Sequence, residues 1–312
     1  MQLFNKTTTI DFMGQRKYAV VFSAALILLS SISLIVRGLD FGIDFTGGTI
    51  VEIGYPEPAE LGAIRARLEN MGFSGAVVQH FGTTRDVLVR LPPQGDLDKA
   101  TLSTQVIQGL GVETGIELAL RRVEFVGPQV GKELAEQGGL AMLIALGAIL
   151  IYVAMRFEYR FALGSVAALI HDVIITLGFF SIFSLEFDLT VLAALLAVIG
   201  YSLNDTIVVF DRIRENFRKI RKGTPSEILN QSLNQTLART LITSLTTLLV
   251  LITLFFLGGK LIHGFSTALI IGVFIGTYSS VYVASTTVLM LGVSKADFML
   301  VKKEEIDGDN QL

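Results

Sequence analysis

The amino-acid sequence predicts an α-helical integral membrane protein with six transmembrane helices and one small α+β domain between the first two helices. Six apolar blocks have, or come close to, the length of about 20 residues that a helix needs to cross a bilayer. A more polar stretch of about 100 residues follows the first block and combines strand and helix patterns. Only 17% of the 312 residues are charged and 51% are hydrophobic. This composition excludes a disordered chain and argues against an ordinary soluble enzyme.

The six apolar blocks give the positions of the helices. They are Tyr18–Val36, Leu140–Met155, Phe161–Phe183, Leu189–Phe210, Leu237–Leu257 and Phe265–Leu291. The second block is short enough to be a buried helix of a soluble protein, but Gly138 and Gly139 before it and five similar neighbours favour a membrane span. We therefore divide the chain into an N-terminal segment 1–17, a first helix 18–36, an inserted domain 37–138, helices two to six within 139–292, and a tail 293–312.

Lysine and arginine are concentrated in segments that fall on one side of the membrane if all six blocks span it. These basic residues are Lys6, Arg16, Lys17, Arg156, Arg160, Arg212, Arg214, Arg218, Lys219, Arg221, Lys222, Lys295, Lys302 and Lys303. The short segments on the other side contain Glu186, Asp188 and only Lys260. Because cytoplasmic segments carry the excess of basic residues, both termini are predicted to be cytoplasmic and the inserted domain periplasmic. The first block has no small-x-small cleavage site before Arg37, so we expect it to remain as an anchor.

The inserted domain shows four strand patterns and two helix patterns. The strand candidates are Thr49–Ile53, Ala76–Phe81, Val87–Leu91 and Arg121–Val126. Amphipathic helices are expected at Ala59–Met71 and Leu97–Leu110, each followed by a glycine. The order β-α-β-β-α-β is typical of the ferredoxin-like fold. It indicates a fold but no chemistry.

The composition also excludes several kinds of site. The chain has no cysteine, which rules out disulfides, thiol nucleophiles and cysteine-rich zinc sites. The three histidines, at 80, 171 and 263, are too few and too scattered for a histidine metal site, and we expect neither metal nor cofactor. A net charge of −3 offers no basic field for nucleic acid.

Four ionisable residues interrupt the apolar blocks: His171, Asp172, Asp205 and Arg239. A charge at the centre of a membrane helix costs about 2.5–3.5 kcal/mol, so these side chains should face the bundle interior. Asp172 lies about 16 Å along its helix, near the midplane. The neighbouring His171 should point about 100° away, and we do not expect the two to pair simply. A structural polar pair and a proton relay explain them equally well.

Asp205 lies about 9 Å inside the cytoplasmic end of the fourth block. Tyr201 and Ser202 lie one turn back on the same face, and Asn204 precedes the carboxylate directly. A helix–helix hydrogen bond would explain Asp205 structurally, whereas a buried carboxyl without a fixed partner could exchange a proton near neutral pH. We favour proton exchange because ionisable residues inside membranes usually have a function.

Arg239 begins the fifth block and could simply extend to the interface. It shares a helix face with Thr243 and Thr247, however, and a polar stripe of this kind is not expected to face lipid. A charge pair with Asp205 that forms and breaks with protonation would be a coupling element. Small residues every four positions from Gly272 to Ala284 form a face for close helix contact, either within the bundle or with another subunit. Thr224–Glu227 is typical of a capping box and predicts a helix start there.

Several short elements follow one another in a fixed order along the chain. They are Phe41–Gly48 (FGIDFTGG), Val126–Gly131 (VGPQVG), Arg156–Phe157, His171–Asp172, Gly200–Thr206 (GYSLNDT), Asp211–Asn216, Arg239–Thr247 and Gly258–Gly259. This series resembles the SecF branch of the SecD/SecF family of protein-export membrane proteins, within the RND transporter superfamily. The resemblance covers essentially residues 10–292.

The resemblance implies a subunit of the bacterial inner membrane that works with a SecD-like subunit and the SecYEG channel. Such a subunit uses the proton-motive force to promote late steps in the export of an unfolded polypeptide, and it is not an enzyme. It contacts lipid and binds no nucleic acid. Asp205 and Arg239 fall on the proton pathway of the family, whereas the resemblance assigns no comparable role to His171 and Asp172.

Three other functions stay open at this point. Half of a small-molecule RND-type exporter would normally need two six-helix halves and larger periplasmic domains. An intramembrane aspartyl protease would use Asp172 and Asp205, but the residues before Asp205, Ser202-Leu203-Asn204, differ from the Gly-x-Gly-Asp element of that class. A passive assembly factor would keep every packing feature without a proton role.

Overall fold

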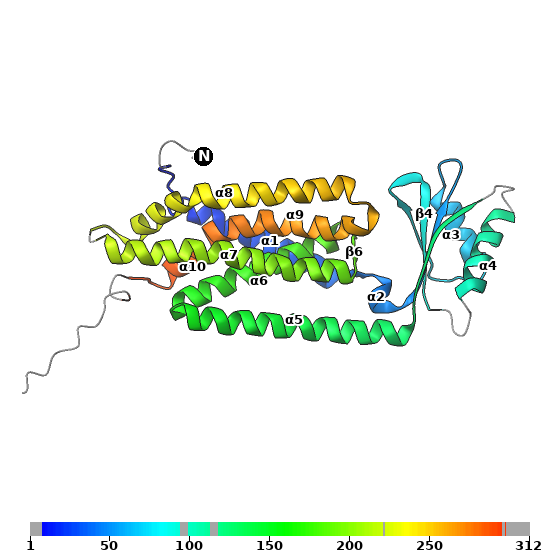
Figure 1. Ribbon diagram of the computed structural model, residues 1–312, viewed down its shortest axis with the longest axis horizontal. Coiled ribbons are helices and arrows are strands. Elements are labelled where there is room, and N and C mark those ends of the chain that lie inside the picture. The colour runs from blue at the N-terminus through cyan, green and yellow to red at the C-terminus, as the bar shows by residue number, and fades with distance from the viewer. Residues whose placement is uncertain (1–7, 94–98, 113–117, 221, 295–296, 298–312) are drawn as a thin grey trace, which may run out of the picture.

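The computed structural model shows a long bundle of helices joined at one end to a four-stranded sheet (Figure 1). The structure describes residues 8–93, 99–112, 118–220, 222–294 and 297. We call the end of the bundle next to this sheet the sheet end, and the opposite one the far end. Within the described residues, six helices are long and apolar enough to cross a membrane. They are α1 (Arg16–Val36), α5 (Pro128–Arg156), α6 (Tyr159–Ile182), α7 (Leu189–Lys219), α8 (Pro225–Leu257) and the continuous run of α9 (Lys260–Ser279), η1 (Ser280–Ala284) and α10 (Ser285–Met290).

The sheet domain follows the predicted order of elements. These are β2 (Gly48–Gly54), α3 (Leu61–Asn70), β3 (Val77–Phe81), β4 (Thr83–Leu91), α4 (Lys99–Val112) and β5 (Ala119–Val126). The strands lie in the order β3-β4-β2-β5 and all neighbours are antiparallel. Helices α3 and α4 cover one face, and Ile64, Leu68 and Val106 pack there on Val51 and Val89. The predicted start of the second helix, Leu97, lies outside the described residues.

Two of the membrane helices extend well beyond the bounds predicted from the sequence. Helix α5 begins at Pro128 rather than Leu140, inside the segment predicted to belong to the insert. Helix α7 continues to Lys219, so the basic segment after Phe210 is largely helical and not a loop. The extension of α7 is amphipathic and buries Ile213 and Phe217 against the start of α8. Apolar length marks only the part that crosses the membrane and misses such extensions.

The predicted capping box at the start of α8 is confirmed. The hydroxyl of Thr224 accepts a hydrogen bond from the Glu227 amide (3.3 Å), and the Glu227 carboxylate accepts one from the Thr224 amide (2.8 Å). Helix α8 runs without interruption from Pro225 to Leu257, which is about 50 Å. Its first turns therefore extend past the far end of the membrane-crossing segment.

A junction that the sequence did not predict connects the sheet domain to the bundle. Strand β1 (Asp40–Phe41) pairs in parallel with β6 (Glu186–Phe187), and the single-turn helix α2 (Ile43–Thr46) follows β1. Two-residue strands are too short to show a period in the sequence. Because β6 directly precedes α7, the junction joins the sheet domain to that helix.

Four polar contacts hold this junction. Arg90 of β4 donates hydrogen bonds to Asp40 Oδ1 (3.0 Å) and to the Phe41 carbonyl oxygen (3.1 Å). Its other terminal nitrogen lies 2.9 Å from Glu186 Oε2. Asp44 Oδ2 accepts a hydrogen bond (3.0 Å) from the amide of Leu189, which is the first residue of α7. The sheet domain is thus tied to the sheet end of α7 by charge and by main-chain contacts.

Candidate functional site

Helices α6 and α7 form the centre of the bundle. More than half of the membrane-crossing stretch of each is buried inside the chain, whereas the corresponding stretches of α1, α5 and α8 are mostly exposed. Polar side chains on the inward faces of α6 and α7 are consequently screened from lipid. The candidate site lies there, where these two helices meet α9.

Asp205 is held by hydroxyl groups from two other helices. Its side chain lies on α7 and is only 6% exposed. Oδ1 accepts a hydrogen bond from Thr240 of α8 (2.8 Å), and Oδ2 accepts one from Ser280, the first residue of η1 (2.8 Å). η1 is a π-helical turn, a feature that is frequent at functional sites. The carboxylate therefore connects three helices at one point.

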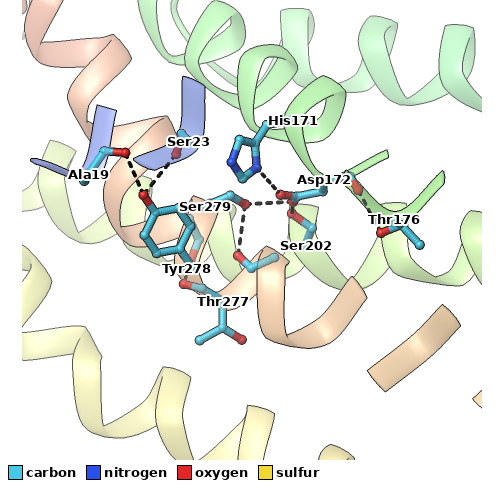
Figure 2. A network of polar contacts seen from close by, with 11 residues as sticks. Ala19, Ser23, His171, Asp172, Thr176, Ser202, Thr277, Tyr278 and Ser279 are labelled. Atoms are coloured by element: carbon cyan, nitrogen blue, oxygen red, sulfur yellow. Dashed lines mark hydrogen bonds and ion pairs between the residues drawn. The ribbon is translucent and has the colours of Figure 1, made fainter. Parts of the chain in front are cut away.

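Asp172 is the centre of a second, fully buried set of contacts (Figure 2). Its Oδ2 accepts hydrogen bonds from Ser202 of α7 (2.5 Å) and Ser279 of α9 (2.7 Å). Its Oδ1 lies 2.9 Å from Nδ1 of His171. The expectation that His171 and Asp172 do not pair was wrong. Although their Cα–Cβ bonds diverge, Nδ1 and a carboxylate oxygen both lie close to the backbone and can meet beside the helix.

The two carboxylates are linked through neighbouring residues on two helices. Ser202 and Asp205 lie about one turn apart on α7, and Ser279 and Ser280 are consecutive on the facing helix. The hydroxyl of Ser279 reaches Asp172, while that of Ser280 reaches Asp205. A structural change at one carboxylate can thus act on the other through two adjacent peptide units.

Glycines allow α9 to lie close enough for these contacts. A Cβ added to Gly272 would lie 2.1 Å from Val198 Cγ2, and one added to Gly276 would lie 3.1 Å from the Cβ of Ser202. The small-residue face of this helix packs on α7, which confirms its interpretation as packing within the bundle.

The other predicted polar residues are not ligands of Asp205. Tyr201 donates a hydrogen bond to Ser244 of α8 (3.1 Å). Thr243 and Thr247 donate to carbonyl oxygens of their own helix, and Asn204 is exposed. None of these hydrogen bonds joins the two carboxylates.

Arg239 is exposed on α8, directly before the Thr240 that donates to Asp205. Both oxygens of Asp205 accept from hydroxyls, so the predicted pair with Arg239 is not one of these hydrogen bonds. Its formation stays a prediction. Asn204, Gly200 and Thr243 are exposed on the same two helices, α7 and α8. Arg239 is thus one of several small or polar residues that these two helices leave uncovered.

Sequence reasoning missed Tyr278 and Ser279. Tyr278 donates a hydrogen bond to the carbonyl oxygen of Ala19 (2.9 Å), its hydroxyl lies 3.0 Å from that of Ser23, and its ring lies 6.0 Å from the ring of His171. The available signal was the run Thr277–Ser280, which places four polar residues in a row inside an apolar block. In the described part of the chain, no group of three or more His, Asp or Glu residues is arranged to hold a metal ion.

The described part of the chain has six membrane-crossing helices, two carboxylates hydrogen-bonded in their interior, and an α+β domain at one end. These features define a multi-pass membrane protein with a buried polar network. The chain belongs to the SecD/SecF family. The family model "Protein export membrane protein SecD/SecF, C-terminal" matches residues 107–294, and the "SecD/SecF GG Motif" matches residues 32–55. The second match contains β1, α2 and all of β2, and thus one side of the junction.

Similar proteins extend over nearly the whole chain. The protein translocase subunit SecF of Vibrio alginolyticus is 54% identical, with 99% of this chain and 98% of that protein covered. The subunit of the same name from Escherichia coli O157:H7 is 50% identical, with 99% and 96% covered. The crystal structure of SecDF from Thermus thermophilus, described as a translocon-associated membrane protein, matches with a TM-score of 0.83 and 39% identity. That match covers 93% of this chain but 39% of the SecDF chain.

Proposed function

We propose that this chain is the SecF-type subunit of a bacterial protein translocase, and that it uses the proton-motive force together with a SecD-like subunit. It acts on an unfolded polypeptide in late steps of export through the SecYEG channel, as a transport protein of the inner membrane without catalytic residues. Relatives at up to 54% identity are named as translocase subunits, which supports the assignment. The sheet domain is then a periplasmic ferredoxin-like domain, and both termini are cytoplasmic, as the distribution of basic residues predicts.

The observation that carries the proton role is the position of Asp205. An ionisable group is expensive inside a membrane-crossing bundle, and this one is buried and bonded to two other helices. A charged carboxylate accepts both hydroxyl hydrogens, whereas a protonated carboxyl must donate one hydrogen bond itself. Proton binding therefore requires Thr240 or Ser280 to reorient, and it changes how α8 and η1 pack on α7.

The energy available is sufficient for such a change. One charge that crosses 100 mV provides about 2.3 kcal/mol, which biases a two-state element about 50-fold. A shift of α7 reaches the sheet domain directly, because Asp44 accepts a hydrogen bond from the first amide of the helix and β6 pairs with β1. The periplasmic domain would then move and pull or hold the emerging polypeptide.

The exposed face of α7 and α8 supports a SecD-like partner. Arg239, Asn204 and Thr243 are exposed on helices that cross the membrane, where uncovered polar groups are costly. A second helical bundle that covers this face would shield Arg239 and bring it into a closed proton route with Asp205. The remaining apolar surfaces of α1 and α5 contact lipid.

Export in membrane vesicles, with and without an uncoupler, tests the proposed function. Asp205→Asn keeps the shape of the protonated carboxyl, and we expect it to abolish proton-dependent export while the complex with the SecD-like subunit still assembles. Arg239→Met should have the same effect, whereas Arg239→Lys retains the charge and part of the activity. The matched control is Asp188→Asn at the N-cap of the same helix, because asparagine caps a helix as well as aspartate does.

Normal export by Asp205→Asn with normal sensitivity to the uncoupler would show that Asp205 is a packing residue. The passive assembly factor would then be the better description. Peptide cleavage by the purified complex, abolished in Asp205→Asn, would instead favour the protease.

A further inference from the structure

We propose that His171 and Asp172 form a second proton-binding site, coupled to Asp205 through Ser279 and Ser280. Nε2 of His171 is the atom that takes up or releases the proton. The inference rests on the proposed proton role of the bundle and extends it to residues to which neither the family resemblance nor the similar proteins assign a role.

The hydrogen bonds at Asp172 determine which nitrogen of His171 carries a proton. The carboxylate accepts from Ser202 and Ser279 at Oδ2, and at Oδ1 it faces Nδ1 of the imidazole. Because an ionised carboxylate can only accept, the neutral ring carries its hydrogen on Nδ1 and has its lone pair on Nε2. His171 is thus fixed in the tautomer in which Nε2 is the unprotonated, basic nitrogen.

Within the described residues, that nitrogen is buried and has no hydrogen-bond partner. His171 is 1% exposed and lines a cavity of about 280 Å³ between α1, α6, η1 and α10. Thr286 lines the same cavity, and its hydroxyl also lacks a partner among these residues. Figure 2 shows the His171 ring between Asp172 and the α1 segment that carries Ala19 and Ser23. Both polar atoms are buried beside this cavity, and a water molecule in it would reach them after a small rotation of either side chain.

The cavity lies between His171 and the far end of the bundle. It follows α1 from Ala19 to Ile27, about 12 Å within the first half of that helix, and it extends to Met290 at the end of α10. The far end is the cytoplasmic one in the proposed orientation. A proton that leaves Nε2 through this cavity therefore moves toward the cytoplasm.

The proton changes the charge of the pair and not only its hydrogen bonds. Without it, neutral His171 and ionised Asp172 together carry one negative charge. When a proton binds at Nε2, a new N–H bond forms and the imidazolium–carboxylate pair becomes neutral. Ionised Asp205 nearby favours this uptake, because two negative charges in a buried site repel each other. Occupancy at one site therefore lowers the proton affinity of the other.

The two serines provide the physical link between the sites. Ser279 lies 2.7 Å from Asp172 Oδ2 and 3.1 Å from the Gly276 carbonyl oxygen. Ser280 lies 2.8 Å from Asp205 Oδ2 and 3.0 Å from the Thr277 carbonyl oxygen. Each hydroxyl has one hydrogen and two acceptors within reach, so it donates to a charged carboxylate and can turn to its own helix when the carboxyl is neutral.

The groups that surround the pair are otherwise uncharged hydroxyls, with few titratable side chains. On the part of α6 near the site, the titratable groups are His171 and Asp172 themselves, and α7 contributes Asp205. The facing helix contributes Tyr278 and Tyr282, α1 contributes Ser23, and α8 contributes Thr240 with Arg239 beside it.

Nitrogen NMR of ¹⁵N-histidine in the complex with the SecD-like subunit tests the inference without using export activity. The chain has only three histidines, and His171 can be assigned with the variant His171→Asn. We expect the neutral Nδ1–H tautomer at high pH and conversion to the imidazolium as the pH is lowered. Asp205→Asn should lower the midpoint of this conversion by about one pH unit, a tenfold loss of proton affinity, because the nearby negative charge is gone.

The serine link has its own matched variants. Ser279→Ala should weaken the response of His171 to Asp205→Asn, since the donor between the sites is lost. Ser266→Ala removes a buried hydroxyl on the same helix that donates only to its own backbone, and it should change nothing.

A His171 ring that keeps one protonation state as the pH is lowered, or a midpoint that does not change in Asp205→Asn, would overturn the inference. In that case loss of proton-dependent export in Asp205→Asn would still support the proposed function. The opposite outcome is distinguishable. If the His171 midpoint responds to Asp205→Asn but that variant exports normally, the second proton site stands and the export role of Asp205 is refuted.

Discussion

At Gly48 the backbone has a φ of 131°, and an added Cβ would lie 2.4 Å from the carbonyl oxygen of Leu91. We expect Gly48→Ala to destabilise the sheet domain by about 3 kcal/mol, through backbone strain and a steric clash with a rigid neighbour. Limited proteolysis in mild detergent measures the change. Gly62→Ala on the exposed side of α3, where a Cβ meets nothing within 4 Å, is the control and should be neutral or stabilising. Equal protection of the two variants would contradict the argument.

Arg90 and Glu186 should respond to substitution unequally. Burial raises the pKa of Glu186, and the neighbouring Arg90 offsets only part of that effect. Arg90→Met leaves Asp40 and Glu186 without their shared cation, and we expect the junction to lose about 3 kcal/mol. Glu186→Gln should cost much less, since the site already disfavours the charge. The Gly42 amide donates a hydrogen bond to the Phe187 carbonyl oxygen across the junction. Hydrogen exchange at this amide measures the stability of the junction in both variants.

The same pKa shift predicts the pH dependence of the junction. A carboxyl whose pKa is raised in the folded state binds protons more readily there than in the unfolded state. Its contribution to stability is therefore fully present at acid pH, below the ordinary glutamate value, and it is lost as the pH rises through the raised pKa. Glu186→Gln should flatten this dependence. If the protection of the Gly42 amide from exchange increases with pH in the unmodified chain, this prediction is wrong.

Single residues differ in how far the sequence reveals them. His171, Asp172, Asp205 and Arg239 could be found because ionisable groups are rare in apolar blocks. The hydroxyl partners, among them Ser279, could not be found in this way, because serine and threonine are common in membrane helices and their contacts depend on which helices are neighbours. The direct contact of His171 with Asp172 was missed because helix geometry predicts the direction of Cβ but not the reach of the side chain.

Helices α7 and α9 depend on the absence of a side chain at Gly272. Gly272→Ala places a Cβ 2.1 Å from Val198 Cγ2, one turn from the Gly276–Ser202 contact. We expect a loss of about 2 kcal/mol in the stability of the bundle and a longer distance between Ser279 and Asp172. Thermal unfolding in detergent and proton-dependent export measure the two effects. Gly147→Ala in α5, where an added Cβ meets nothing within 4 Å, is the matched control. A normal melting temperature for Gly272→Ala would show that the helices can move apart freely.

The elements that the sequence predicts well are those with a long repeating pattern. Six helices and four strands lie where apolar length and alternation placed them. The start of α5 and the end of α7 were missed because the helices continue beyond the membrane-crossing part as amphipathic segments. Strands β1 and β6 have two residues each, and they exist because α1 and α6 bring them side by side. Tertiary structure, not local pattern, determines such elements.

At the scale of the whole molecule, the proposed mechanism requires the sheet domain and the far end of the bundle to lie on opposite sides of the membrane. The sequence contains no cysteine, so single cysteines can be introduced without a background signal. Glu57→Cys lies in the exposed part of the sheet domain, and Arg218→Cys is exposed at the far end of α7. A membrane-impermeant maleimide should label Glu57→Cys once the outer membrane is made permeable, and Arg218→Cys only after the inner membrane is broken. We predict this orientation from the excess of lysine and arginine in far-end segments, because charge asymmetry of this kind directs insertion. If the two positions are labelled in the reverse order, the cavity at His171 would open to the periplasm, and the direction of proton movement through the bundle would be inverted.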